Sequence, residues 1–395
     1  MWEQIRSNQI RSVLLVALMG ILLLLLGYFL GLFFFGSGVG GLIIALIIWA
    51  IMNLVAYFQG DSILLAVAGA RKINRDDHPR LYNIVEEMRI ASGLEKAPDI
   101  YIIDDMALNA FATGRDPNRA AVAITSGLLQ KLNRDELQGV IGHEIAHIKN
   151  RDVLLMAMSA VLLGTIVILA WYASRFLFYG GMARSRRSSS REGGGAGQLI
   201  ILAVAIVLMI LAPIMAQLIY LAVSRRREYL ADASSALYTR YPEGLASALE
   251  KLAAGNTQVK QANRATAPMY IMNPLEKKEM SLSDLTSTHP PIRERVRILR
   301  AMAGGVSLAA YDRAYQEARH NGKGVIPASA ISAAAVAPRV ASPEAALSEP
   351  DSIERARETS DLMWRLHEYR TVTCACGTKL RAPPTFRETS IECPH

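Results

Sequence analysis

The chain has 395 residues, of which 51% are hydrophobic and 20% are charged, and its net charge of +8 comes from 43 basic and 35 acidic side chains. Many basic residues flank long uncharged runs, a pattern typical of lipid headgroup contacts and not of nucleic-acid binding. All three cysteines lie at or after position 374, which excludes a disulfide framework in the main body.

Four apolar segments are long enough to cross a bilayer, whose hydrocarbon core requires about 20 helical residues. Residues 12–60 carry no charge, and the sequence GSGVGG divides them into two segments. Pro213 is expected to kink the last segment. We therefore predict a mainly α membrane protein with four transmembrane helices, at residues 12–35, 39–58, 153–174 and 198–223.

Two polar segments, 61–152 and 224–325, are expected to form one domain, because two spans separate them and return the chain to the same side. The positive-inside rule conflicts with this topology if the amino terminus is cytoplasmic, since the outer loop 175–192 then carries five arginines. Either the cytoplasmic domains override the rule, or the third and fourth segments do not fully cross. The sequence leaves both alternatives open.

The first polar segment is predicted to combine helices with a small sheet. A helix begins at Asp77-His78-Pro79, with proline in its first turn, and ends at Ser92-Gly93. Asn133 and Glu136 form a capping-box pattern that begins a later helix. The predicted strands are 99–103, 107–113 and 120–126, the last two forming a hairpin around the turn GRDPNR.

The second half of the chain divides into further parts by composition. Residues 326–350 are rich in alanine, proline and serine without apolar periodicity, which favours a disordered linker. Residues 351–370 are predicted to form a short amphipathic helix before a cysteine-bearing tail. The resulting division is 1–60, 61–152, 153–223, 224–325, 326–350 and 351–395.

The capped helix carries the sequence His-Glu-Ile-Ala-His, typical of zinc hydrolases. His143 and His147 are four residues apart and therefore lie on one helix face, where both imidazoles can bind one zinc ion. Glu144 is rotated by about 100° and can accept a proton from water at the metal. The alternative is two surface histidines on an amphipathic helix.

A catalytic zinc site needs a third protein ligand and an open position. The extended pattern with a third histidine is absent, because Asn150 occupies the position of its glycine. Glu228 and Asp232 are spaced four apart in EYLAD, so one can be a ligand and the other can orient a histidine. The same spacing is also common on solvated helix faces.

Together these motifs resemble the HtpX-type membrane zinc metallopeptidases, in the wider family that includes the CAAX-processing Ste24 proteases. The resemblance covers roughly residues 1–300. It implies a zincin-like α+β catalytic domain with a small sheet, Glu228 as the third zinc ligand and Asp232 as its companion. It is carried by DDHPRLYNIVEEM (76–88), NAFATG (109–114), the stretch 121–152, SRRREYLADASSA (224–236) and THPPIRERV (288–296).

The resemblance also implies a substrate cleft. It is expected along NAFATG, where an edge strand would pair with peptide backbone and tolerate many sequences. The residues expected to contact substrate are Asn109, Ala110, Phe111 and Ala112.

His289 and Arg295 carry alternative interpretations. The imidazole of His289 would stabilise the negative charge on the attacked carbonyl, or it would only begin a helix before Pro290-Pro291. Arg295 would bind substrate, brace the site or be an ordinary surface residue. Asn150 and Asp152 are expected to fix the end of the zinc helix and not to touch the metal.

The tail contains two short cysteine motifs, Cys-Ala-Cys-Gly at 374–377 and Cys-Pro-His at 393–395, that resemble the ligand-bearing turns of a zinc ribbon. Either the chain as given is cut one residue short of a Cys-x-x-Cys, or His395 is the fourth ligand of a second, structural zinc ion. The alternative is a tail that binds no metal. The candidate ligands are Cys374, Cys376, Cys393 and His395.

The expected function is an integral-membrane zinc metalloendopeptidase, with the lipid bilayer as one partner. His147 lies six residues before the third predicted span and Glu228 five after the fourth, which places zinc within roughly 10 Å of the span ends. Membrane proteins or unfolded polypeptides are the expected substrates. The resemblance implies quality control under stress at the cytoplasmic face of a bacterial inner membrane.

Other functions fit less well. The alternatives are a prenyl-protein (CAAX-type) processing protease and a catalytically silent membrane scaffold. A silent scaffold would not need Glu144 as a general base. A metal transporter is disfavoured because the predicted spans contain no acidic residue or histidine. The oligomeric state is not predicted.

Overall fold

A computed structural model describes most of the chain outside the second pair of predicted spans. The helical run that includes Val153 is described as far as residue 157, but the remainder of the predicted spans 153–174 and 198–223 lies outside the described residues except for isolated positions, and so does His395. The described residues are 2–157, 160, 175, 206, 210, 225–255, 259–260, 267–272, 289–319, 324–327, 331, 336–339, 350–387 and 390–394.

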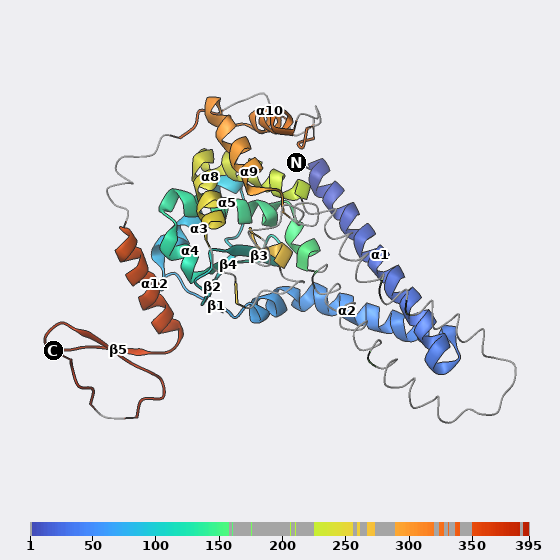
Figure 1. Ribbon diagram of the computed structural model, residues 1–395, viewed down its shortest axis with the longest axis horizontal. Coiled ribbons are helices and arrows are strands. Elements are labelled where there is room, and N and C mark those ends of the chain that lie inside the picture. The colour runs from blue at the N-terminus through green and yellow to red at the C-terminus, as the bar shows by residue number, and fades with distance from the viewer. Residues whose placement is uncertain are drawn as a thin grey trace.

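The chain begins with a hairpin of two long helices that projects from the rest of the molecule (Figure 1). Helix α1 spans Trp2–Phe35 and α2 spans Gly38–Val67. Among the described helices, α2 is long and apolar enough to cross a membrane, and α1 contains a shorter apolar stretch, Val16–Leu32. The first two predicted spans are therefore helical, whereas the four-span arrangement rests on residues outside the described ranges.

Small residues bring α1 and α2 into backbone contact. A Cβ atom on Gly41 would lie 2.2 Å from the carbonyl oxygen of Gly27 and 2.5 Å from Cα of Gly31, so only glycine fits at this crossing. Close packing at small residues is characteristic of helix pairs in lipid. The large apolar side chains of the hairpin instead point outward and are exposed, among them Val13, Leu14, Ile43, Ile47, Ile51 and Leu54.

Helix α2 continues beyond the predicted span end at residue 58. Leu64 and Leu65, in its last turns, are buried in the core of the domain that follows. The polar residues Asp61 and Ser62 do not end the helix, because helical hydrogen bonding needs no apolar side chains. One continuous helix thus joins the apolar hairpin to the domain.

A four-stranded sheet lies at the centre of that domain, in the order β1-β2-β4-β3. Strands β2 and β4 are parallel, and the other two pairs are antiparallel. Helix α5 packs against β3 and β4, while the end of α2 contacts β1, β3 and β4. The strands are β1 Ala70–Lys72, β2 Asp99–Ile103, β3 Ala110–Asp116 and β4 Arg119–Thr125.

The predicted hairpin is confirmed with shifted ends. Strand β3 begins at Ala110 instead of 107, because side chains bond to the backbone just before it. Asp105 Oδ1 accepts from the N–H of Ala107 at 2.9 Å, and Asn109 Oδ1 accepts from the N–H of Ala110 at 3.1 Å. Such local bonds compete with the strand ladder. Strand β1 was not predicted, since its three residues carry no periodic signal.

The two capped helices of the first polar segment are confirmed. His78 Nδ1 accepts from the N–H of Leu81, and Gly93 ends the helix at φ 71°. Asn133 and Glu136 cap each other's backbone N–H groups. The helices of the domain are α3 Pro79–Ser92, α4 Ser126–Lys131, α5 Arg134–Lys149, the helical run 225–239, α8 Pro242–Ala254, α9 Ile292–Arg300 and α10 Leu308–Arg319, with short 3-10 turns at Ala267–Met269 and Ala301–Gly304.

The C-terminal part is a helix and a two-stranded sheet on the side of the domain away from α1 and α2 (Figure 1). The predicted amphipathic helix is confirmed as α12 (Ser352–Leu366), which packs on α4 and is followed by β5 (Arg370–Thr373) and β6 (Lys379–Ala382). Within the predicted linker 326–350, one described position pairs with the domain. Val336 exchanges backbone hydrogen bonds with Val306 at 2.9 and 3.0 Å.

Candidate metal centre

Helix α5 and the helical run 225–239 bring three metal-ligating side chains together. His143 and His147 lie one turn apart on α5, with their Nε2 atoms 3.2 Å from each other. The carboxylate of Glu228 faces both, 3.5 Å from His143 Nε2 through Oε2 and 3.5 Å from His147 Nε2 through Oε1. All three side chains are buried.

The two helices approach closely because α5 carries small residues on the contact face. Ser235 donates a hydrogen bond through Oγ to the carbonyl oxygen of Gly139 at 2.7 Å. A Cβ on Gly142 would lie 3.0 Å from Ser235 Oγ, and one on Gly139 would lie 2.7 Å from the backbone nitrogen of Leu245, at the start of α8. Glycine therefore lets α5 contact both neighbours, and Glu228 reaches the histidines.

Each histidine is oriented by a second carboxylate. His143 Nδ1 lies 3.0 Å from Asp232 Oδ1, and His147 Nδ1 lies 3.1 Å from Asp152 Oδ2. Asp152 reaches back because Arg151 takes the left-handed conformation, at φ 59°. With Nδ1 of each ring facing a carboxylate, the proton sits on Nδ1 and the Nε2 lone pairs face Glu228.

This donor set fits a metal cation. Two imidazole lone pairs and a carboxylate converge within 4.8 Å at a buried point. Burial opposes ionisation of Glu228, yet the adjacent imidazole of His289 holds its pKa well below the ordinary value. Among the described residues Glu228 Oε2 accepts no hydrogen bond of normal geometry, although His289 Nδ1 lies 3.2 Å and Arg295 Nη1 lies 3.6 Å from it. The lone pairs of the two imidazoles and the carboxylate repel one another where they converge, and a divalent ion with nitrogen and oxygen ligands removes that repulsion.

Arg295 is fully buried beneath this centre. Its guanidinium donates to both oxygens of Asp232, from Nε at 2.8 Å and from NH2 at 2.7 Å, and it also donates to the carbonyl oxygen of Ile271 at 3.3 Å. Burial again opposes ionisation of Asp232, but Arg295 keeps its pKa below the ordinary value. A guanidinium so enclosed fits the bracing interpretation of Arg295 better than direct substrate binding or an ordinary surface position.

Glu144 lies beside the centre on the side of β3. Its carboxylate accepts a hydrogen bond from the backbone N–H of Ala112, and Oε1 has no partner among the described residues. Burial raises the pKa of Glu144, although His143 and His147 act in the opposite direction. A carboxylate with a raised pKa is suited to accepting and returning a proton near neutral pH.

The expected substrate strand is only partly accessible. Asn109, Ala110, Phe111 and Ala112 are all buried. The N–H of Ile271 donates to the carbonyl oxygen of Ala110 at 2.9 Å, so residues of the same chain occupy the start of the outer edge of β3. Asn109 Nδ2 donates to the carbonyl of Met272 at 2.9 Å, and the ring of Phe111 packs on Tyr270.

His289 is also brought to the centre, with Nδ1 3.2 Å from Glu228 Oε2. Asp152 was missed as an orienting residue, because a carboxylate five positions after His147 would point away on a continuous helix. The turn at Arg151 changes that direction. The tail cysteines are not part of this centre and form a second cluster.

The centre has an arrangement found in metallopeptidases: a buried His-Glu-x-x-His helix faces a glutamate from a second helix. Comparisons with known proteins agree. The model of peptidase family M48 matches residues 75–303, more than half of the chain. The chain belongs to this family, and the exposed apolar hairpin of α1 and α2 makes it a membrane metallopeptidase.

The similar relatives bear the description protease HtpX homolog. One from Dictyoglomus turgidum is 46% identical over 301 residues, covering 76% of this chain and 94% of the relative. One from Streptococcus pneumoniae (strain Hungary19A-6) is 42% identical over 302 residues, covering 76% and 100%. Among solved structures, S. mikatae Ste24p matches with a TM-score of 0.39 and 19% identity, covering 75% of this chain and 66% of that one, a likeness too low to place residues.

Proposed function

We propose that the protein is a zinc-dependent endopeptidase that hydrolyses peptide bonds of membrane proteins or unfolded polypeptides at the membrane surface. The observation that carries this proposal is the convergence of His143, His147 and Glu228, with Glu144 beside them. Two imidazoles and one carboxylate that leave a position open are the ligand set of catalytic zinc. In this proposal the chain crosses the membrane several times and the site faces the cytoplasm of a bacterium. The physiological role is quality control of membrane proteins.

The chemistry divides between the metal and the side chains. Zinc, when bound, would polarise the scissile carbonyl and acidify a water molecule. Glu144 accepts the proton of the attacking water and returns it to the leaving amine, since its buried carboxylate has a raised pKa. In this proposal His289, whose Nδ1 lies 3.2 Å from Glu228 Oε2, stabilises the negative charge that develops on the carbonyl oxygen. Asp232 and Asp152 hold the imidazoles in the required tautomer.

The position of β3 supports a substrate that arrives from the membrane. Strand β3 contacts α2, and the guanidinium of Arg115, in β3, lies 5.6 Å from the ring of Phe58 and 5.9 Å from that of Tyr57. Aromatic and arginine side chains gather at bilayer interfaces. A peptide that pairs with the later part of β3 would therefore lie next to the point where α2 enters the bilayer.

Two other functions make different predictions. A prenyl-protein protease would cleave a prenylated C-terminal peptide in preference to an internal bond. A catalytically silent scaffold would not depend on Glu144, whereas this residue is buried and its Oε1 has no hydrogen-bond partner among the described residues. The endopeptidase is the function that uses every group assembled here.

The test is Glu144→Gln in the full chain purified in detergent, with metal content and cleavage of a membrane-embedded substrate measured together. We expect unchanged zinc and cleavage slowed by roughly 10²–10⁴-fold, as for the loss of a general base. Glu136→Gln is a matched control on α5, because glutamine preserves a capping box. Retained cleavage by Glu144→Gln would refute the assigned base.

A substrate comparison tests the remaining part of the proposal. Wild-type protein is offered the same cleavable segment in three forms: embedded in a bilayer, as a free soluble peptide and as a prenylated C-terminal peptide. Faster cleavage of the embedded form supports the membrane preference. Equal rates for the embedded and soluble forms would contradict it, and a preference for the prenylated form would favour the processing protease.

A further inference from the structure

The C-terminal hairpin carries a second cluster of metal-ligating side chains. The Sγ atoms of Cys374, Cys376 and Cys393 lie within 4.8 Å of one another, and those of Cys376 and Cys393 are 3.4 Å apart. The cluster lies outside the residues 75–303 that match the peptidase family. We propose that these three thiols bind a thiophilic divalent ion of the zinc class, which holds the hairpin together and supports its contact with α12.

The backbone at the cluster is shaped to present two sulfur atoms from one turn. Strands β5 and β6 pair as far as Thr373 and Lys379, and the turn between them closes through two hydrogen bonds. Cys374 N–H donates to the carbonyl of Thr378, and Gly377 N–H donates to that of Cys374, both at 2.9 Å. Gly377 takes φ 86°, a conformation that favours glycine. The sequence Cys-Ala-Cys-Gly therefore forms a knuckle.

The sulfur chemistry agrees with this geometry. The Cys376 thiol donates to Thr378 Oγ1 at 3.2 Å. The hydroxyl of Thr378 can donate to the Cys376 sulfur once the thiol has lost its proton. A thiolate is the form that binds a metal, and several thiolates close together are stable only beside a cation.

The hairpin has no hydrophobic core of its own. Every residue of β5 is exposed, and half of the surface of Val372 is open to solvent. An isolated two-stranded hairpin is at best marginally stable in water, and modules this small are commonly held by metals or disulfides. The three cysteines are free thiols, so they are available to hold the hairpin through a shared metal ion.

The hairpin in turn contacts the end of α12. Arg381 of β6 forms an ion pair with Asp361, and its guanidinium lies 5.0 Å from the ring of Trp364. The ring of Trp364 also packs against Tyr369 at 4.5 Å. These contacts link the hairpin to α12, and Trp364 and Tyr369 also line a cavity next to the peptidase domain.

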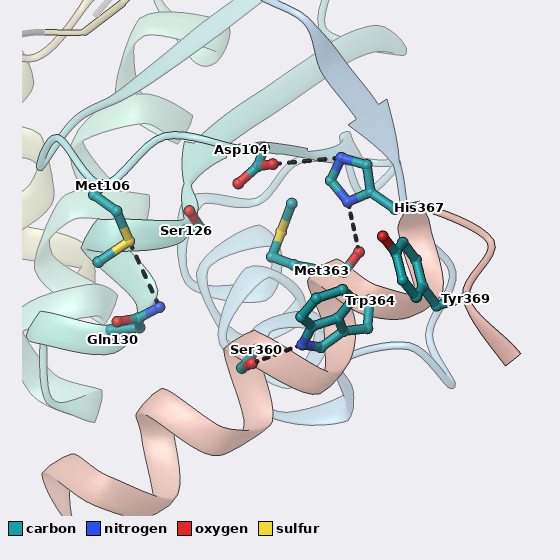
Figure 2. A pocket seen from close by; sticks show the side chains of 9 residues that line it. All are labelled: Asp104, Met106, Ser126, Gln130, Ser360, Met363, Trp364, His367 and Tyr369. Atoms are coloured by element: carbon teal, nitrogen blue, oxygen red, sulfur yellow. Dashed lines mark hydrogen bonds and ion pairs between the residues drawn. The ribbon is translucent and has the colours of Figure 1, made fainter. Parts of the chain in front are cut away.

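A cavity of about 410 Å³ lies between α12 and the domain. Figure 2 shows Met363 and Trp364 of α12, with His367 directly after that helix, facing Asp104 and Met106 across the cavity. His367 Nε2 lies 3.4 Å from Asp104 Oδ2. A metal ion bound by the cysteines would thus help to order α12, which forms one side of this cavity. Its loss should loosen residues 352–366 without disturbing the catalytic ligands.

Cobalt substitution separates the two sites, because only the tail has sulfur ligands. The full chain is purified in detergent under reducing conditions, stripped of metal and loaded with Co²⁺. We expect sulfur-to-cobalt charge-transfer absorption in the near ultraviolet from the wild type and from Glu228→Ala. The variant Cys376→Ser/Cys393→Ser should lose the band, bind one zinc equivalent fewer and keep its peptidase activity.

Hydrogen exchange gives an independent measurement. Metal-free wild type and the double serine variant should exchange faster in residues 352–366 than the zinc-loaded wild type. The proposal is overturned if the double serine variant binds as much zinc as the wild type and the charge-transfer band is absent from both. It is also overturned if Cys376 and Cys393 form a disulfide under reducing conditions and no thiol-bound metal is found.

Discussion

The two clusters of metal-ligating residues differ in what holds them in place. His143, His147 and Glu228 come from two helices packed in the core, and neighbouring carboxylates orient both rings. Cys374 and Cys376 come from a turn on an exposed hairpin. Packing prepares the first cluster for a metal ion, whereas the second, in our proposal, depends on a bound ion for order. The difference suits a catalytic site, which must keep its geometry through turnover, and a structural one, which need not.

The largest effect is expected from Arg295→Met, which tests whether packing prepares the core cluster. The substitution leaves the buried Asp232 without its bidentate partner. Loss of one member of a buried ion pair costs about 3–5 kcal/mol. Because Asp232 orients His143, zinc affinity should also fall, by roughly 10–100-fold. Thermal unfolding and a zinc titration measure the two changes.

Arg300→Met is the matched control, since Arg300 lies on the same helix and also contacts two carboxylates. Those carboxylates, Glu243 and Glu250, are exposed, so solvent screens the pairs. Zinc affinity should not change. If both variants lower stability and zinc affinity equally, Arg295 has no special link to the metal centre.

A smaller effect is expected at His78, where the domain meets the C-terminal part. Burial, and then the charges of Arg80 and Arg365, lower the pKa of His78 to about 4. Arg365 belongs to α12 and donates to the carbonyl of Asp77 at 2.7 Å. The neutral imidazole accepts from the N–H of Leu81 and so caps α3.

The sign of the pH dependence follows from these values. Between pH 6.5 and 4 the unfolded chain binds more protons at His78 than the folded chain, so the free energy of unfolding falls as the pH is lowered. The total contribution is about 3 kcal/mol at most. His78→Asn keeps a capping side chain but cannot titrate, so its stability should fall less over the same pH range. Parallel stability curves for wild type and variant would contradict the assignment.

The smallest effect is expected from Arg381→Ala, which tests the contact between the hairpin and α12. The ion pair with Asp361 is partly exposed, so global stability should change by less than about 1 kcal/mol. Hydrogen exchange in residues 370–382 should nevertheless become faster. Unchanged exchange there would mean that the hairpin is held without Arg381.

Local signals in the sequence predicted the parts that local chemistry determines. Asn133 with Glu136, and His78 with Pro79, placed the ends of α5 and α3, and the His-Glu-x-x-His spacing placed both histidines on one face. The Glu-x-x-x-Asp spacing identified Glu228 and Asp232 as candidates. Only the family resemblance assigned Glu228 as the metal ligand and Asp232 as its companion. These features depend on residues close together in the chain.

Features that depend on distant residues were not predicted. The side chain of Asp152 turns back to His147 because of one left-handed residue, and Ile271 occupies the edge of β3 from more than a hundred positions away. The contact of α1 with α2 did have a signal. Gly27 and Gly31 are spaced as in helix pairs that pack in lipid, and this spacing could have been recognised.

The most direct test of the account is the zinc content and turnover of Glu228→Ala, measured on the same preparation. The account requires one ion held jointly by α5 and the helical run 225–239, so zinc at the core site and peptide cleavage should be lost together while the chain remains folded. Full zinc binding at that site with unimpaired cleavage would contradict the joint ligand set and, with it, the hydrolytic mechanism.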